Sequence, residues 1–175
     1  MAINELMLQE IAKGSKEALA QLYVQTNQAV YGFALSILKN KHDAEDVMQE
    51  TYLKVYYGVN SYVSQGKPMA WILTITRNCA LMKLRQHKKE QTCSSQASEA
   101  WGINHSYQTQ EDGLILDAAM RVLSDEERQI IVLHAVAGFK HKEIALLLQL
   151  PLSTVLSKYQ RGLKKLQKCL REESR

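Results

Sequence analysis

The chain has 175 residues, of which 46% are hydrophobic, and a formal net charge of +4. No stretch approaches the ~20 consecutive apolar residues of a membrane-spanning helix, and the N-terminal segment MAINELMLQEIAKG lacks the basic and apolar regions of a secretory signal. We therefore expect a cytoplasmic protein with no membrane insertion, built from one domain or two small ones.

The cysteines and histidines predict no chemical centre. Cys79, Cys93 and Cys169 are odd in number and form no C-x-x-C pair, which argues against a disulfide framework and against structural zinc. The histidines lack metal-ligand spacing, and the sequence contains neither a phosphate-binding G-x-x-x-x-G-K-[ST] motif nor a G-x-S-x-G motif. We expect no enzyme activity, no cofactor and no metal.

Proline and charge are both unevenly distributed. The two prolines, Pro68 and Pro151, fall where helices are expected to begin, so the chain is predicted to be almost entirely helical. Residues 1–90 carry eleven Lys or Arg and eight Asp or Glu, and residues 117–175 carry eleven and seven. Residues 91–116 carry three acids and no Lys or Arg. Two mildly basic blocks are thus joined by an acidic connector.

The first block predicts three helices. Apolar residues recur at steps of three and four from Leu19 to Ile37, and Ser15 is suited to cap that helix. A second helix is expected from Asp43, as its N-cap, to about Tyr57. After a loop over residues 58–67, Pro68 opens a third helix that runs to about residue 89.

The second block predicts a helix followed by a helix-turn-helix. Residues 91–113 are dominated by Ser, Gln, Thr and acids, which indicates a flexible linker and a domain boundary. In residues 114–175, Ser124 and Glu127 form a capping box that opens a helix over 125–136, ended by Gly138. The segment HKEIALLL at 141–148, a turn at 149–151 and a helix over 153–170 follow.

The last helix pairs an apolar stripe with a basic face. The predicted buried stripe is Val155, Tyr159, Leu163, Leu166 and Leu170, and the basic residues off it are Lys158, Arg161, Lys164, Lys165 and Lys168. A basic face is often simply solvated. Here the helix follows a helix-turn-helix turn and contains no acid that balances the charge, which favours DNA, since phosphates attract lysines and N-terminal side chains reach base edges.

Two other helices carry polar surfaces whose purpose stays open at this point. Asp43 and Glu45 suit the positive end of their helix, but Asp46, Gln49 and Glu50 form a separate ridge that is either a docking surface or a solvated face. In the third helix, Trp71, Ile72 and Ile75 are expected mostly in the core, whereas Thr74, Arg77, Asn78 and Met82 share another side. The basic residues near its end, which include Lys83 and Arg85, suit the helix dipole at least as well as nucleic acid.

In their order and spacing, these segments resemble one known family. Residues 15–170, apart from the linker, resemble bacterial RNA polymerase sigma factors of the sigma-70 family, extracytoplasmic-function (ECF) group. DAEDVMQETYLKVY at 43–56 and WILTITRN at 71–78 resemble the sigma-two domain with its promoter-melting helix, and LSDEERQIIVLHAVAGFKHKEIALLLQLPLSTV at 123–155 resembles the sigma-four domain. The resemblance implies an all-α protein of two small helical domains, 1–90 and 114–175, that directs promoter-specific transcription initiation.

The resemblance also implies partners and site residues. Asp46, Gln49 and Glu50 are expected to dock on the beta-prime clamp helices of core RNA polymerase, and the beta flap and an anti-sigma factor are further expected partners. Residues expected at the minus-ten promoter DNA are Ser61, Trp71, Thr74, Arg77, Asn78, Lys83 and Arg85, with the loop 61–66 capturing a flipped base. Residues expected at the minus-thirty-five element are Lys142, Ser153, Thr154, Ser157, Lys158 and Arg161.

Three positions depart from the family pattern. Met82 stands where the family usually has Asp, Gln149 where it favours Gly, and Leu156 where it favours Lys. Two alternative functions therefore remain: a stand-alone helix-turn-helix regulator, and a sigma-like scaffold that no longer reads promoters.

Overall fold

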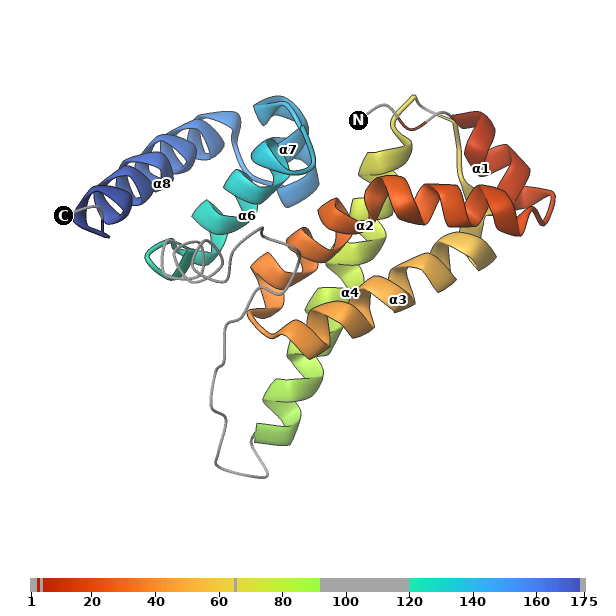
Figure 1. The fold of residues 1–175 in the computed structure, drawn as a ribbon, viewed down its shortest axis with the longest axis horizontal. Coiled ribbons are helices and arrows are strands. Elements are labelled where there is room, and N and C mark those ends of the chain that lie inside the picture. Colours follow the sequence, from red (N-terminus) through yellow and green to blue (C-terminus); the bar gives the residue numbers. More distant parts are fainter. Residues whose placement is uncertain (1–2, 4, 65, 92–119, 174–175) are drawn as a thin grey trace.

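The computed structural model describes residues 3, 5–64, 66–91 and 120–173, and within these ranges every regular element is a helix (Figure 1). The first domain contains α1 (Glu5–Ala12), α2 (Lys16–Leu38), α3 (Lys41–Gly58), the short 3-10 helix η1 (Val59–Ser61) and α4 (Pro68–Gln91). The second contains α6 (Asp125–Ala135), α7 (His141–Leu148) and α8 (Leu152–Glu173). The all-α prediction with two helical domains is confirmed. The predicted linker, apart from Gln91, lies outside the described residues.

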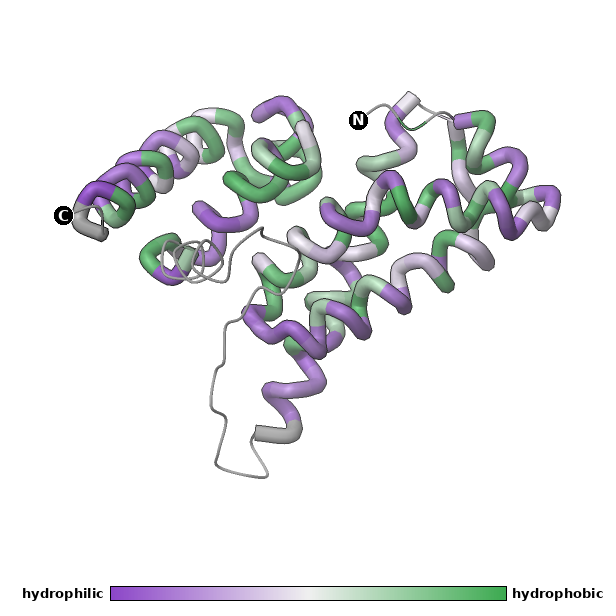
Figure 2. The backbone as a smooth tube through the Cα atoms, in the orientation of Figure 1, coloured by the Kyte–Doolittle hydropathy of each residue, from purple (hydrophilic) through white to green (hydrophobic). Residues whose placement is uncertain are grey.

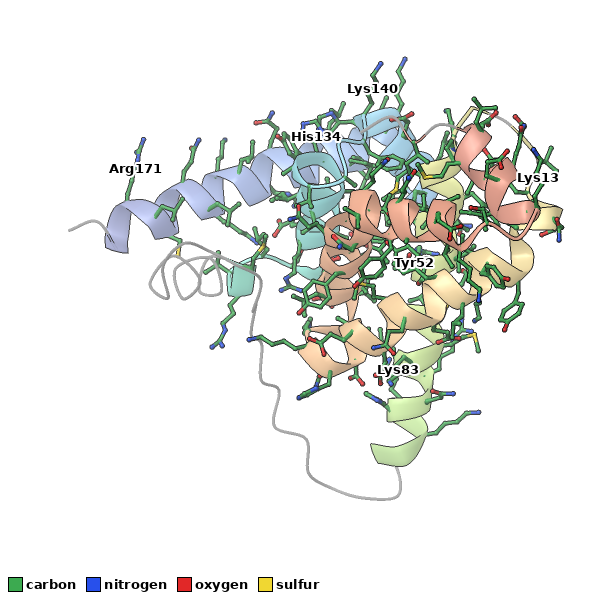
Figure 3. The ribbon with its side chains drawn as sticks, turned by 45° about the vertical axis from the view of Figure 1, so that its right-hand side comes forward. Lys13, Tyr52, Lys83, His134, Lys140 and Arg171 are labelled. Carbon is green, nitrogen blue, oxygen red and sulfur yellow. The ribbon has the colours of Figure 1, made fainter. Side chains whose placement is uncertain are left out.

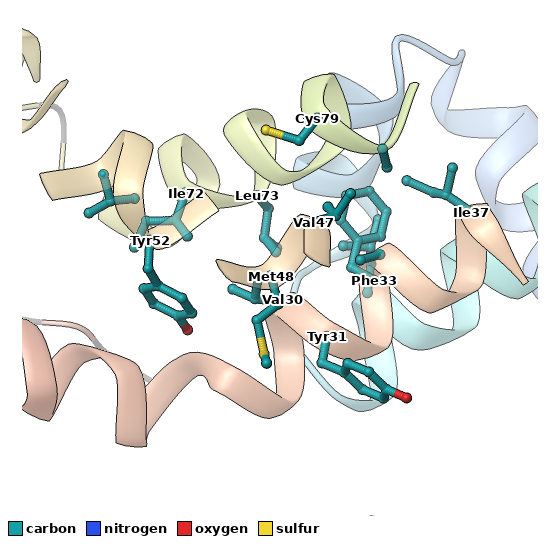
Figure 4. Close-up of a cluster of buried hydrophobic side chains, with 14 of the residues drawn as sticks. Val30, Tyr31, Phe33, Ile37, Val47, Met48, Tyr52, Ile72, Leu73 and Cys79 are labelled. Carbon is teal, nitrogen blue, oxygen red and sulfur yellow. The ribbon is translucent and has the colours of Figure 1, made fainter. Parts of the chain in front are cut away.

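The first domain is a bundle of α2, α3 and α4 around one apolar core. Its centre is formed by fully buried side chains, among them Phe33, Val47, Ile72 and Leu73 (Figure 4). Each of the three helices contributes an apolar stripe, and burial of such side chains is the main force that holds helices together. The predicted bounds of these helices agree with the structure to within about three residues.

Two features of this domain differ from the sequence prediction. The helix α3 begins at Lys41, and its N-cap is Asn40, whose side chain accepts a hydrogen bond from the backbone N–H of Asp43 at 3.2 Å. Asp43 therefore lies in the first turn and is not the cap. The helix α1 was not predicted, because its eight residues show only two buried positions, Leu8 and Ile11, too short a pattern for periodicity to stand out.

The second domain begins with the predicted capping box. The Ser124 hydroxyl accepts a hydrogen bond from the Glu127 N–H at 3.4 Å, and the Glu127 carboxylate accepts one from the Ser124 N–H at 2.9 Å. The helix that follows ends at Ala135, one residue before the predicted end at residue 136, and Gly138 takes a left-handed conformation in the turn that comes after it. The capping box marks the start of the helix, and the left-handed glycine follows its end, as the sequence predicts.

The helix-turn-helix is formed by α7 and α8. Gln149 ends α7 in the left-handed conformation, with φ 58° and ψ 42°, and its N–H bonds back to the carbonyls of Ala145 and Leu146. A residue with a side chain is strained there by about 1 kcal/mol. The structure thus shows that this turn keeps its left-handed geometry without the usual glycine.

The two domains pack against each other through α2 and α6, which lie side by side (Figure 1). At Gly32 an added Cβ would lie 3.5 Å from the Val132 side chain, so the helices approach closely at this point. Lys39 and Asp125 form an ion pair across the contact at 2.8 Å, and α4 also touches α7. The buried cluster of the first domain therefore continues into the second.

Among the described residues, no helix is at once long enough and apolar enough to cross a membrane. The last turns of α4 are hydrophilic, and along α8 hydrophobic and hydrophilic residues alternate from turn to turn (Figure 2). Both helices therefore present polar surfaces beyond the parts that pack in the core.

Candidate docking and nucleic-acid surfaces

The polar ridge of α3 is at the surface, as predicted. Asp46 and Gln49 are exposed and Glu50 is partly buried, and their spacing places all three on one side of the helix. Asp46 forms an ion pair with Lys83 of α4 at 2.7 Å, and Glu50 forms one with Lys54 at 2.7 Å. The hydrogen bond from Lys83 and its charge lower the pKa of Asp46. The ridge thus carries two carboxylates, and both already form ion pairs with lysines of the same domain.

An apolar groove of about 600 Å³ lies next to this ridge and was not predicted. Its lining residues are Lys16, Leu19, Tyr23, Gln49, Tyr52, Leu53, Tyr56 and Tyr57. The side chains of Leu53 and Tyr57 are 58% and 76% exposed, although both are large and apolar. Exposed aromatic and aliphatic residues beside a polar rim are typical of protein-binding surfaces. A sequence signal existed, since α3 carries more apolar residues than one buried stripe requires.

Tyr52 anchors the floor of the groove. Its hydroxyl shares a 2.7 Å hydrogen bond with the buried Thr26 hydroxyl of α2, and its ring packs against Tyr23 with centroids 4.9 Å apart (Figure 3). Burial raises the pKa of Tyr52, so this group stays neutral at physiological pH. The groove is therefore held in shape by contacts between α2 and α3.

One side of α4 carries most of the residues predicted at minus-ten DNA. Thr74, Asn78 and Arg85 are exposed and Arg77 is partly buried. Their steps of three, four and seven residues place them along one face. Trp71, which was expected mostly in the core, is only partly buried, whereas Ile72 is completely buried.

The loop before α4 is attached to this surface through an aromatic contact. The rings of Tyr62 and Trp71 pack with centroids 5.1 Å apart, tilted by 52°. Ser61 is exposed in η1, and its hydroxyl donates to the Gly58 carbonyl at 2.7 Å. The structure therefore brings the loop and the first turn of α4 together.

Lys83 is placed differently from the other residues predicted at minus-ten DNA. Its ammonium lies 2.7 Å from Asp46 and 3.4 Å from Asp43, both on α3 (Figure 3). The hydrogen bond to Asp46 raises the pKa of Lys83. In this structure Lys83 therefore connects α4 to the polar ridge, and its contact with DNA would require it to exchange these carboxylates for phosphate.

The predicted minus-thirty-five residues gather around the start of α8. Lys142, Ser153, Ser157 and Arg161 are exposed, and Thr154 is partly buried. Side chains at the N-terminal end of a recognition helix are those that reach base edges in a major groove. Four of the six residues predicted at the minus-thirty-five element are therefore exposed in the helix-turn-helix.

Two details of α8 differ from the sequence analysis. Acids do balance part of its charge, because Lys158 pairs with Glu126 at 2.5 Å and Lys165 with Glu127 at 2.7 Å. Both acids lie on α6, so the sequence of α8 alone does not reveal these pairs. Leu170, assigned to the buried stripe, is 46% exposed, since α8 extends beyond the helices on which it packs.

A cluster of three rings joins the helices of the second domain. The ring of His134 of α6, labelled in Figure 3, stacks on that of His141 of α7 with centroids 4.6 Å apart. Tyr159 of α8 meets both rings edge-on. The Nδ1 atom of His134 lies 2.8 Å from the Phe139 carbonyl. The Nε2 atom of His141 is buried without a hydrogen-bond partner among the described residues. Burial, and then the charge of His134, lower the pKa of His141.

The protein is expected to lose stability as the pH falls below about 6.5, the ordinary pKa of histidine. Because the folded state holds His141 at a lowered pKa, the unfolded state binds more protons, and the free energy of unfolding decreases on acidification by at most about 1.4 kcal/mol per pH unit for one group. The variant His141→Phe is expected to reduce this slope. Urea unfolding at pH 5.5, 6.5 and 7.5 measures it, with His42→Phe at an exposed position as the control. An unchanged slope in His141→Phe would contradict the assignment.

Comparison with known proteins supports the order of the two domains. Residues 22–90 match the Sigma-70 region 2 family and residues 113–166 match the Sigma-70, region 4 family. The ECF RNA polymerase sigma factor SigK of Mycobacterium ulcerans is 30% identical over 174 residues, which cover 94% of this chain and 91% of SigK. The ECF RNA polymerase sigma factor SigM of Bacillus subtilis is 31% identical over 129 residues, covering 70% of this chain and 77% of SigM.

A solved structure shows the same arrangement of helices. The sigma factor RpoE from Bartonella quintana, in complex with the anti-sigma factor NepR, superimposes with a TM-score of 0.76 and 25% identity, over 87% of this chain and 96% of RpoE. The fold, the two matched families and the relatives across nearly the whole length agree. The chain belongs to the ECF group of sigma-70 RNA polymerase sigma factors, non-enzymatic proteins that direct transcription initiation with RNA polymerase.

Proposed function

We propose that this sigma factor docks on the beta-prime clamp helices of core RNA polymerase through Asp46, Gln49 and Glu50. The proposal is supported by the exposure of this ridge and by the apolar groove beside it. A negatively charged ridge bordered by Leu53 and Tyr57 suits a partner helix that carries basic and apolar residues, because charge steers the approach and the apolar contact slows dissociation.

Promoter reading is divided between the two domains. The minus-ten element is contacted by the exposed side of α4 and by the loop before it, through Ser61, Trp71, Thr74, Arg77, Asn78, Lys83 and Arg85. The minus-thirty-five element is contacted by Lys142, Ser153, Thr154, Ser157, Lys158 and Arg161. Supporting this division, the aromatic pair of Tyr62 and Trp71 adjoins polar side chains on α4, a combination suited to unpaired bases. The start of α8 adjoins the turn at Gln149, as a recognition helix requires.

The functional units are residues 1–90 for polymerase binding and minus-ten recognition, 91–113 as an acidic linker, and 114–175 for minus-thirty-five recognition. The second unit also contacts the beta flap of the polymerase. An anti-sigma factor regulates the protein, in line with the NepR complex of its relative RpoE. Its site of action is the cytoplasm, where core polymerase and promoter DNA are found.

Run-off transcription from a genomic promoter library, with purified core polymerase and this chain, tests the whole proposal. Transcripts that depend on the chain and start downstream of a shared pair of sequence elements are expected. Specific DNA binding without polymerase and without such transcripts would favour the stand-alone regulator. Polymerase binding without transcripts would favour the sigma-like scaffold. Positions that depart from the family pattern, such as Met82 and Leu156, would then account for the loss of promoter reading.

A further inference from the structure

The carboxylate of Glu5, the first residue of α1, receives three hydrogen bonds from one loop. The Tyr62 hydroxyl donates at 2.9 Å, the backbone N–H of Gly66 donates at 2.7 Å, and the Ser64 hydroxyl is the third donor. Glu5 is separated from these residues by 57 to 61 positions in the sequence. A single acidic side chain therefore ties the N-terminal helix to the loop between η1 and α4.

These contacts are strong for a position that is only partly buried. Hydrogen bonds to an ionised acceptor are shorter and stronger than neutral ones. The donors at 62, 64 and 66 span most of the loop, so they restrict its backbone at both ends. Gly66 has a φ of +70°, a left-handed conformation that glycine adopts without strain. The carboxylate and the glycine together favour one loop shape.

The fixed loop is continuous with the surface of α4. Tyr62, which donates to Glu5, also packs its ring against Trp71 at 5.1 Å. A displacement of Tyr62 would therefore move an aromatic side chain at the start of α4. Glu5 itself is a poor candidate for DNA contact, because a carboxylate repels phosphate.

We infer that Glu5 is a positioning residue for base capture: it holds loop residues 61–64 and 66 in the shape that receives an unpaired base of the minus-ten element. The inference rests on the proposed minus-ten role of this loop. Glu5 lies on α1, outside residues 22–90 that match the Sigma-70 region 2 family. It acts through Tyr62, Ser64 and Gly66, without touching the base.

The test uses holoenzyme reconstituted from core polymerase and the full chain. Fluorescence anisotropy measures its affinity for labelled single-stranded oligonucleotides that carry the minus-ten element of a promoter found by run-off transcription. Each position of the element is made abasic in turn, and the wild-type protein is expected to lose affinity most at the captured base. Glu5→Ala is expected to reduce that discrimination by roughly tenfold, the size of one lost charge-assisted hydrogen bond.

Matched variants separate positioning from a general structural effect. Glu5→Gln keeps an amide oxygen that accepts from the loop, so it is expected to restore most of the discrimination. Glu10→Ala removes an equal charge from α1, where Glu10 pairs with Lys13 at 2.8 Å, and is expected to behave as wild type. Affinity for duplex minus-thirty-five DNA is expected to be equal in all variants.

The outcomes have distinct meanings. If the wild-type holoenzyme shows no position-specific loss, the proposed minus-ten role of the loop is wrong and the inference falls with it. If the wild type discriminates and Glu5→Ala discriminates equally, the positioning role is wrong while the minus-ten role stands. If Glu5→Ala weakens every oligonucleotide and the minus-thirty-five duplex by the same factor, its effect is general, and the positioning role is again overturned.

Discussion

The double variant Asp46→Arg/Glu50→Arg is expected to bind core RNA polymerase at least about a hundredfold more weakly than the wild-type chain. Each substitution reverses a charge on the proposed docking ridge, and like charges across an interface cost several kcal/mol. The variant also loses the ion pairs with Lys83 and Lys54. Exposed pairs of this kind contribute about 1 kcal/mol or less each, so the fold is expected to persist.

Size-exclusion co-elution and fluorescence titration with core polymerase measure this loss, and thermal unfolding checks that the variant is folded. Glu45→Arg is the matched control, because Glu45 is exposed on the same helix but lies off the ridge. Equal binding by the double variant and the wild type would remove the docking assignment. If Glu45→Arg weakens polymerase binding equally, the effect is due to net charge and not to the ridge.

Replacement of Arg128 is expected to destabilise the protein more than any exposed substitution. The residue is 4% exposed, and its guanidinium donates to the Leu123 carbonyl at 2.9 Å, the Met120 carbonyl at 3.1 Å and the Asp125 carboxylate at 3.1 Å. Arg128→Ala removes three donors at once and leaves acceptors without their partner, for which we expect a loss of about 3 kcal/mol in the free energy of unfolding.

Arg128→Lys is expected to lose nearly as much, since an ammonium cannot reproduce the planar fork that serves three acceptors in different directions. Urea unfolding followed by circular dichroism measures both variants, with the exposed Arg161→Ala as the control. A loss below about 1 kcal/mol in Arg128→Ala would show that Met120 and Leu123 find other partners or water.

Local signals in the sequence predicted the helices well. Ser15 and the capping box of Ser124 and Glu127 mark helix starts because their side chains satisfy backbone donors within three residues, which is information that a short segment contains. The same rule failed at Asp43, where Asn40 was an equally suitable cap three residues earlier. Where two residues suited to the N-cap position lie close together, the sequence alone does not show at which of them the helix begins.

Contacts between distant segments were not predictable in this way. The pairing of Lys158 with Glu126, of Lys83 with Asp46 and the loop contacts of Glu5 join residues that lie 32 or more positions apart. No spacing rule brings such residues together, since their proximity depends on how helices pack. The sequence therefore identified the exposed residues of each surface, whereas their internal partners emerged only from the three-dimensional arrangement.

Under the proposed function, the contact between α2 and α6 opposes simultaneous binding of both promoter elements. Sites at minus ten and minus thirty-five are separated by about 25 base pairs, or roughly 85 Å of B-form DNA, whereas a compact chain of this length has a radius of gyration of about 16 Å. With α6 packed on α2, the two proposed reading surfaces cannot occupy both sites at once.

Under the proposed function, the affinity for a complete promoter therefore includes the free energy needed to open this contact. Each 1.4 kcal/mol by which a change at Gly32, Val132 or the ion pair of Lys39 and Asp125 favours the closed form lowers the apparent affinity about tenfold. A ligand that binds both domains while they are packed together would inhibit promoter binding without contacting any of the proposed DNA-reading residues. The free energy of the α2–α6 contact would therefore set how tightly the protein binds a promoter, although the side chains that form this contact touch neither promoter element.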